Sequence, residues 1–87
     1  MPDATTSQML GETIRELREQ REMTIKQLAH AAGLHDRFLQ RLEKGKENPS
    51  ARTLVAISVA LEILPSELFR RFSRRVMKTI ASDHAKR

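Results

Sequence analysis

Four long polar side chains lie close together in the middle of the chain, within the stretch GLHDRFLQRLEKG that runs from Gly33 to Gly45. At about 100° per residue, a helix over this stretch would carry on one side Arg37, Gln40, Arg41 and Lys44. Its other side would carry Phe38, Leu39 and Leu42. One side can therefore pack, while the other presents a row of hydrogen-bond donors. Such a row is either an ordinary solvated face or a surface that binds a ligand.

The sequence lacks the residue patterns that support catalysis or metal binding. It has no cysteine, so it offers neither disulfides nor thiolate ligands, as is usual in a reducing cytosol. His30, His35 and His84 lie too far apart in the sequence to suggest a metal pair. No nucleophile motif of the G-x-S-x-G type and no glycine-rich phosphate loop occurs. We therefore expect no enzymatic activity, no cofactor and no metal.

The positive charge of the chain is unevenly distributed. The net charge is +5, but residues 1–69 carry nine Lys/Arg against ten Asp/Glu, a net of −1. Residues 70–87 carry seven Lys/Arg against one Asp, a net of +6, so the excess belongs to the C-terminal part. Its basic residues Arg70–Lys78 are either a solubilising face or a weak, non-specific attraction for DNA. The only aromatic residues are three Phe, which counts against single-strand binders that stack bases on aromatic side chains.

Apolar spacing and capping residues predict an all-α fold of five helices. They are expected from about Ser7 to Arg21 or Glu22, from Thr24 to Gly33, from His35 or Asp36 to Gly45, from Ser50 to Leu61, and from Pro65 onward. Thr24 and Gln27 have the spacing of a capping box, and Gly33 suits a left-handed C-cap. Pro49 disfavours helical geometry at Asn48, so a loop is expected there.

The last predicted helix carries more apolar residues than one small domain needs. Leu68 and Phe69 are expected in the core. Phe72, Val76 and Ile80 continue the stripe along the same helix. Because an exposed apolar stripe usually marks an interface, we assign Phe72, Val76 and Ile80 to a homodimer interface.

The stretch from Leu10 to Phe69 resembles the phage-repressor and Cro-like family, the XRE family of helix-turn-helix transcriptional regulators. Four segments in order carry the resemblance: REQREMT, QLAHAAGL, RLEKGKENPS and LPSELF. It implies a repressor-like helix-turn-helix domain over residues 7–69, flanked by a flexible N-terminus over 1–6 and a basic C-terminal helix extension and tail over 70–87. It also implies that residues 24–32 cross the DNA backbone and that residues 36–44 form a recognition helix in the major groove.

Carried over residue by residue, the resemblance implies three sets of functional positions. The base-contacting set is Asp36, Arg37, Gln40 and Arg41. The set that contacts the DNA backbone is Thr24, Lys26, Lys44, Lys46, Asn48 and Arg52. Arg18 and Glu43 would form a structural ion pair between the first and third helices. The chain departs from the family pattern at Ile25, where the family usually has Gln, and at His35 and Asp36, where small polar residues or Gln are usual.

These features predict a sequence-specific double-stranded DNA-binding regulator that acts as a homodimer on a palindromic operator. No apolar stretch approaches the roughly 18 residues that span a bilayer, and no signal peptide is evident, so we expect a cytoplasmic protein without a membrane partner. Two alternatives remain open. One is the DNA-binding antitoxin of a toxin–antitoxin pair. The other is a protein-interaction adaptor that has lost DNA binding. The sequence does not specify a toxin or polymerase partner.

Overall fold

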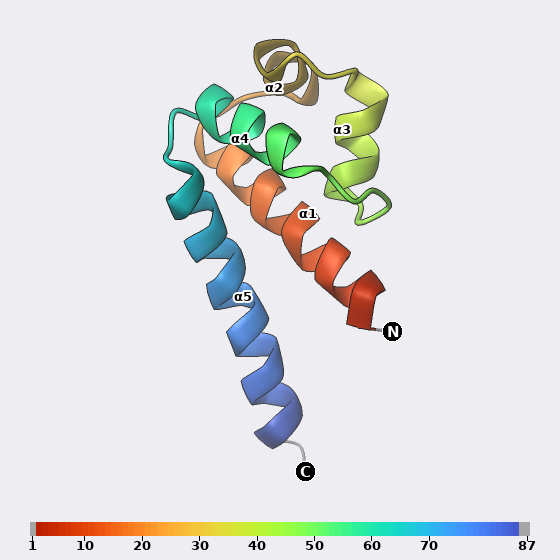
Figure 1. Cartoon of the computed structure of the whole chain (residues 1–87), viewed down its shortest axis with the longest axis vertical. Helices are drawn as coiled ribbons and strands as arrows, with labels where there is room; N and C mark the ends of the chain where they lie inside the picture. The colour runs from red at the N-terminus through yellow and green to blue at the C-terminus, as the bar shows by residue number, and fades with distance from the viewer. Residues whose placement is uncertain (1, 86–87) are drawn as a thin grey trace.

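The computed structural model describes residues 2–85, with side chains described from Thr6 to Ser82. Within that range the chain forms five helices and no strand, as predicted. They are α1 (Pro2–Gln20), α2 (Ile25–Ala32), α3 (Asp36–Glu43), α4 (Ala51–Ala60) and α5 (Pro65–Ala85). In Figure 1, α2, α3 and α4 gather over one end of α1, while α5 runs beside α1 and extends past it. The described part therefore measures 44 × 22 × 22 Å.

Local capping interactions set the bounds of α2. The Thr24 side chain accepts a hydrogen bond from the Gln27 backbone N–H at 3.1 Å, and the Gln27 side chain accepts one from the Thr24 backbone N–H at 2.9 Å. The helix ends at Gly33, whose φ of 70° is readily adopted by glycine. The predicted capping box and C-cap are therefore both present.

The first helix begins earlier than the sequence predicts. α1 starts at Pro2, whereas the polar composition of residues 1–6 suggests that it starts at about Ser7. A proline favours the first helical position, because its fixed φ suits a helix and its missing N–H would have no partner there. The residues after it are mostly polar, so apolar spacing in the sequence gives no sign of a helix there. Met1 lies outside the described residues.

The core is formed where all five helices converge. Its fully or almost fully buried apolar side chains include Ile14, Leu17, Leu28, Leu39, Leu42, Ile57, Leu61 and Leu68. The expectation that Phe69 joins Leu68 in this core is wrong, because Leu68 is 2% exposed and Phe69 is 60% exposed. Phe69 lies about 100° further round the helix and packs edge-on against Phe72, at 5.7 Å between ring centroids.

One arginine fastens α5 to α1. The Arg75 Nε donates to the Thr13 hydroxyl at 3.2 Å, and its terminal nitrogens lie 3.4 Å from the Glu12 carboxylate and 3.0 Å from the Glu16 carboxylate. The basic side of α5 is therefore not wholly a solvated face. Part of it docks the helix on acidic side chains of α1.

Candidate nucleic-acid interface

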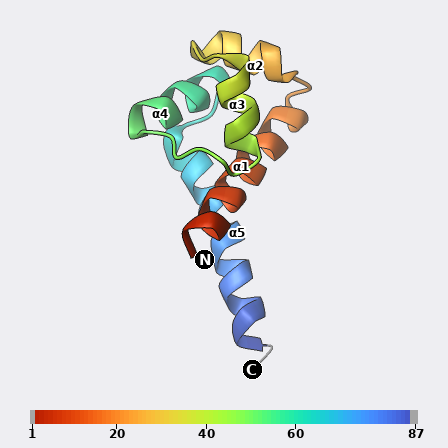
Figure 2. The ribbon, with the colours of Figure 1, turned by 90° about the vertical axis from the view of Figure 1, so that its right-hand side faces the viewer.

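The third helix has one buried side and one exposed side. Leu39 and Leu42 are fully buried, and α3 contacts both α1 and α2. Its opposite side exposes the row that the periodicity predicts, namely Arg37, Gln40, Arg41 and Lys44. In Figure 2, α3 lies toward the viewer, at the surface of the molecule. The packing of two leucines therefore determines which way the polar row points.

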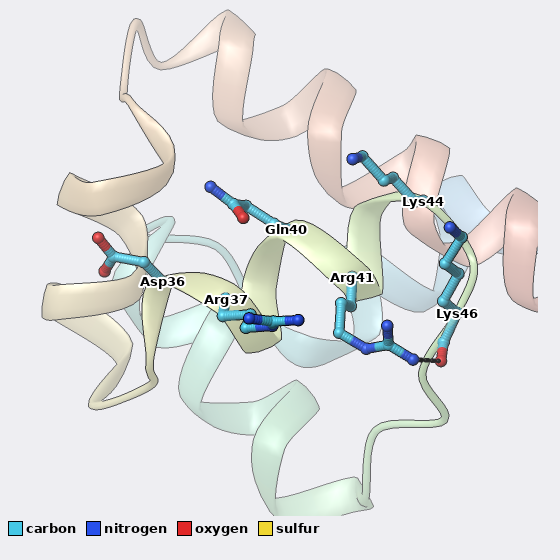
Figure 3. A pocket seen from close by; sticks show the side chains of 6 residues that line it. All are labelled: Asp36, Arg37, Gln40, Arg41, Lys44 and Lys46. Carbon is cyan, nitrogen blue, oxygen red and sulfur yellow. Dashed lines mark hydrogen bonds between the residues drawn. The ribbon is translucent and has the colours of Figure 1, made fainter.

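Six side chains surround a shallow hollow of about 370 Å³ along this exposed side. They are Asp36, Arg37, Gln40, Arg41, Lys44 and Lys46. Four of the six are cationic and one is anionic, so the hollow carries a net charge of +3. In Figure 3 the Asp36 carboxylate lies at the opposite end of the row from Lys44 and Lys46. A hollow of this charge suits an anionic ligand such as the phosphates of a nucleic acid.

The two arginines of the row differ in their partners. The Arg41 Nε donates to the Glu47 carboxylate at 2.8 Å, and its Nη2 lies 3.4 Å from the Lys46 carbonyl oxygen. Arg37 makes no hydrogen bond or ion pair with any other described residue. Glu47 is not among the positions that the sequence suggests. The one feature of the sequence that could have indicated it is its place just after Gly45, where the chain turns back along α3.

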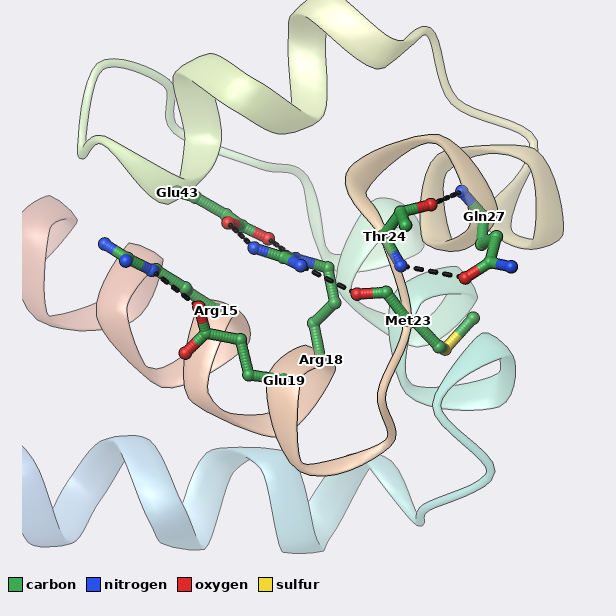
Figure 4. A network of polar contacts seen from close by, with 7 residues as sticks. All are labelled: Arg15, Arg18, Glu19, Met23, Thr24, Gln27 and Glu43. Carbon is green, nitrogen blue, oxygen red and sulfur yellow. Dashed lines mark hydrogen bonds and ion pairs between the residues drawn. The ribbon is translucent and has the colours of Figure 1, made fainter.

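A buried ion pair supports the other side of α3. The Arg18 guanidinium contacts both carboxylate oxygens of Glu43, at 2.8 Å and 3.0 Å, and donates to the Met23 carbonyl at 2.7 Å (Figure 4). The family resemblance implies that these two residues pair, and here their side chains are in contact and only 12% and 6% exposed. The hydrogen bonds with Glu43 raise the pKa of the Arg18 guanidinium, which therefore stays charged at neutral pH. The pair ties α1 and the α1–α2 loop to α3.

The start of α2 places polar groups beside α3. Thr24 is exposed, and its hydroxyl accepts the capping hydrogen bond from Gln27, which leaves its own proton free to donate. Lys26 is exposed as well. Ile25 is half-buried and packs against the core, next to a hollow that Gln40 also lines. An apolar residue at this position therefore packs, whereas the Gln that is usual in the family would offer a polar contact.

The α3–α4 loop carries the rest of the predicted backbone contacts. Lys44, Lys46 and Asn48 are exposed there, and Arg52 is exposed in the first turn of α4. Asn48 accepts a hydrogen bond from the Ser7 hydroxyl at 2.9 Å, so this loop is tied to α1, while the Asn48 amide can still donate. Ser7 belongs to the site without having been predicted, because a contact across 41 residues leaves no local pattern.

A close approach of two backbones also positions α3. Gly11 is buried in α1, and a Cβ built on it would lie 2.4 Å from the Leu42 carbonyl oxygen and 2.7 Å from that of Glu43. Only glycine permits α1 to pass so near the end of α3. Sequence reasoning misses Gly11, because a single glycine inside a helical pattern indicates no particular neighbour.

Residues 2–85 contain no helix that is both long and apolar enough to cross a bilayer. Among the side chains described, from Thr6 to Ser82, no group of three or more His, Asp or Glu could hold a metal ion.

The match with known proteins covers the helices described above. A model of the helix-turn-helix family matches residues 14–68, from the middle of α1 to the start of α5. The chain belongs to this XRE-type helix-turn-helix family. Over 59 residues it is 37% identical to the HTH-type transcriptional regulator DdrOP3 of Deinococcus deserti, with 68% of the chain and 46% of that protein aligned. It is also 37% identical over 59 residues to the immunity repressor protein of Bacillus phage phi105, covering 68% of the chain and 41% of the repressor.

The chain thus spans less than half the length of these curated relatives. Among solved structures, it is similar to the restriction-modification controller protein C.AhdI from Aeromonas hydrophila. The TM-score is 0.69 at 31% identity, and the match covers 70% of this chain and 92% of that protein. Both kinds of similarity agree with the all-α helix-turn-helix architecture.

Proposed function

We propose that this chain is a sequence-specific double-stranded DNA-binding transcriptional regulator whose α3 enters the major groove. The observation that carries the proposal is the division of α3, with Leu39 and Leu42 fully buried and Arg37, Gln40 and Arg41 exposed. An α-helix with its side chains is about 10–12 Å in diameter. The major groove of B-DNA is about 12 Å wide and admits such a helix. Membership of the helix-turn-helix family supports the same function.

The side chains of α3 match the chemistry of base edges. Arg37 and Arg41 suit bidentate hydrogen bonds to O6 and N7 of guanine. Gln40 suits adenine or a phosphate. Asp36 can accept a hydrogen bond from the cytosine amino group, and its place at the far end of the row keeps its charge away from the lysines.

Exposed groups at the start of α2, in the α3–α4 loop and at the start of α4 suit the DNA backbone. They are Thr24, Lys26, Lys44, Lys46, Asn48 and Arg52. Each offers a hydrogen-bond donor or a positive charge to a phosphate. Contacts of this kind set the register and affinity of the complex and carry no sequence information directly. The regulator would act by occupying its operator.

We further propose that the chain acts as a homodimer on a palindromic operator. Of the predicted interface residues, Ile80 is 44% exposed, whereas Phe72 and Val76 are half-buried. Other large apolar side chains on α4, α5 and the loop between them are more exposed, namely Val55, Val59, Leu64, Phe69 and Met77. Exposed apolar side chains are often covered at an interface, and a two-fold partner would bury the same residues on both copies. Two recognition helices would then lie roughly 34 Å apart, one turn of DNA.

The dimer is tested by its mass in solution. Sedimentation of the unmodified protein at micromolar concentration should give a dimer. The double variant Phe69→Asp, Met77→Asp should give a folded monomer, because both side chains are already more than half exposed in the single chain. That monomer should bind a palindromic site far more weakly. A monomeric unmodified protein would contradict the proposed dimer.

DNA recognition is tested by selecting bound duplexes from a random pool at physiological salt. The expected result is one enriched half-site sequence, whose enrichment is lost in the double variant Arg37→Ala, Arg41→Ala. If this double variant binds the selected duplex as strongly as the unmodified protein, the proposal that α3 contacts the bases is wrong. If no duplex is enriched by the unmodified protein, the DNA-binding proposal fails and the adaptor alternative is favoured.

A further inference from the structure

The α3 row contains one arginine that is already held in place before any ligand binds. Arg41 is paired with Glu47 at 2.8 Å, while Arg37, one helical turn earlier, is free of partners within the described residues. Both arginines are exposed and lie on the same face of α3. Glu47 therefore holds the Arg41 side chain in place, whereas no described residue does so for Arg37.

The C-terminal cap of α3 brings Glu47 to this position. The Gly45 N–H donates to the Leu42 carbonyl at 3.0 Å, and the Lys46 N–H donates to the Arg41 carbonyl at 2.9 Å. This is the double hydrogen-bond pattern of a Schellman motif, with Gly45 left-handed at a φ of 77°. The motif folds Lys46 and Glu47 back against the last turn of α3, so the carboxylate meets Arg41 six residues earlier.

The contacts occupy one edge of the guanidinium and leave the other edge open. The Nε faces the Glu47 carboxylate, and the Nη2 is directed at the Lys46 carbonyl. Both atoms belong to the side edge of the group. In Figure 3 the remaining nitrogen of Arg41 points away from the Lys46 carbonyl. The end edge, formed by Nη1 and the outer hydrogen of Nη2, therefore keeps the two parallel donors that bidentate pairing needs.

We propose that Glu47 is a positioning residue that makes Arg41 a reader of base edges and not a phosphate contact. A long arginine side chain loses conformational freedom when it binds, and ordering it in advance reduces that loss. The negative charge of Glu47 also opposes a nearby phosphate. The proposal rests on the proposed DNA-binding function and assigns a part in it to a residue that need not touch DNA.

A purely electrostatic role for Glu47 predicts a different effect of Glu47→Gln on sequence preference. If Glu47 only repels phosphates, Glu47→Gln should tighten binding to every duplex by the same factor and leave sequence preference unchanged. If Glu47 positions Arg41, Glu47→Gln should reduce the preference at the one base pair that Arg41 reads. Binding to unrelated duplexes should then stay the same or become tighter.

The test uses the duplex selected by the unmodified protein and a set of duplexes with one base pair changed at a time. A good bidentate contact corresponds to about a ten-fold preference or more at its base pair. We expect Glu47→Gln to reduce that preference at least five-fold at one position and to leave the other positions unchanged. The matched control is Glu62→Gln, which removes the same charge from an exposed pair with Arg21. In an Arg41→Ala background, Glu47→Gln should have no further effect on preference.

A second measurement does not depend on DNA. In the free protein labelled with nitrogen-15, the Arg41 Nε–H should exchange with water more slowly than that of Arg37, and Glu47→Gln should remove the difference. An equal change on all duplexes, or an Arg41 Nε–H as labile as that of Arg37, would overturn the proposal for Glu47. Failure of the unmodified protein to select any duplex would instead overturn the proposed function, and this inference with it.

Discussion

Two arginine–glutamate pairs end on α3, and they share the same chemistry in opposite settings. Arg18 and Glu43 are 12% and 6% exposed and join through two hydrogen bonds, whereas Arg41 and Glu47 are 45% and 31% exposed and join through one. A buried charge that loses its partner is poorly solvated, so breaking such a pair strongly destabilises the fold. Water screens the exposed pair, which therefore contributes little to stability. Burial, and not charge, therefore separates the pair that joins α1 to α3 from the pair that we assign to binding.

The largest expected effect comes from breaking the buried pair. Glu43→Ala should lower the free energy of unfolding by about 3–5 kcal/mol, because it leaves Arg18 charged and shielded from water. Urea unfolding followed by circular dichroism measures the loss. The control is Glu19→Ala, which breaks an exposed pair with Arg15 and should cost no more than about half a kcal/mol. An unfolding midpoint near that of the unmodified protein would contradict the assignment of Arg18 and Glu43 as architecture.

The pH dependence of this pair follows from the raised pKa of Arg18. Its contribution is fully present below the ordinary arginine pKa and is lost only as the pH rises through the raised value. Titration of Arg18 should therefore leave the unfolding midpoint unchanged across the neutral range.

A second substitution at the contact between α1 and α3 leaves the charges of Arg18 and Glu43 in place. Gly11→Ala should destabilise the protein by about 1–3 kcal/mol, because its Cβ would overlap the carbonyl oxygens of Leu42 and Glu43 and push α1 away from α3. Thermal unfolding measures the change, with the exposed α1 residue Gln20→Ala as the control, for which about half a kcal/mol or less is expected. If Gly11→Ala unfolds at the same temperature as the unmodified protein, then α1 and α3 tolerate a wider spacing than the structure has.

Substitutions on the exposed side of α3 should change the affinity for DNA. Arg37→Ala and Arg41→Ala should each weaken binding to the selected duplex by about 1–3 kcal/mol and relax preference at one base pair. Lys44→Ala or Lys46→Ala should instead weaken all duplexes nearly equally and reduce the slope of affinity against salt by about one unit. Fluorescence anisotropy over a range of salt concentrations separates the two patterns. A lysine variant that changes base preference would contradict the division into base and backbone contacts.

The effect of Glu47→Gln on unfolding can be compared directly with that of Glu43→Ala, and we expect it to be the smallest. Glu47→Gln should change the free energy of unfolding by no more than about half a kcal/mol, because the Arg41–Glu47 pair is partly exposed. The measurement is the same urea titration as for Glu43→Ala, so the two pairs are compared under one set of conditions. A loss as large as that of Glu43→Ala would mean that both pairs are architectural.

Local sequence patterns predicted most of the helix bounds. The Thr24–Gln27 capping box and Gly33 bound α2 as expected, since each depends on residues within a few positions of one another. Leu39 and Leu42 were predictable as the packed side of α3 from periodicity alone. The exposure of Phe69 was not predictable in this way, because the stripe on α5 is broader than the surface against which it packs.

The candidate site shows the same division. Which residues share the exposed side of α3 follows from the sequence, because a helix of known period places residues three and four apart on one face. Which of these residues have partners, and which residues pack behind α3, depends on the tertiary structure. Glu47 meets Arg41 through a left-handed turn, and Gly11 permits the close passage of α1. Such contacts depend on the path of the chain in space, and residue spacing along the sequence does not contain that information.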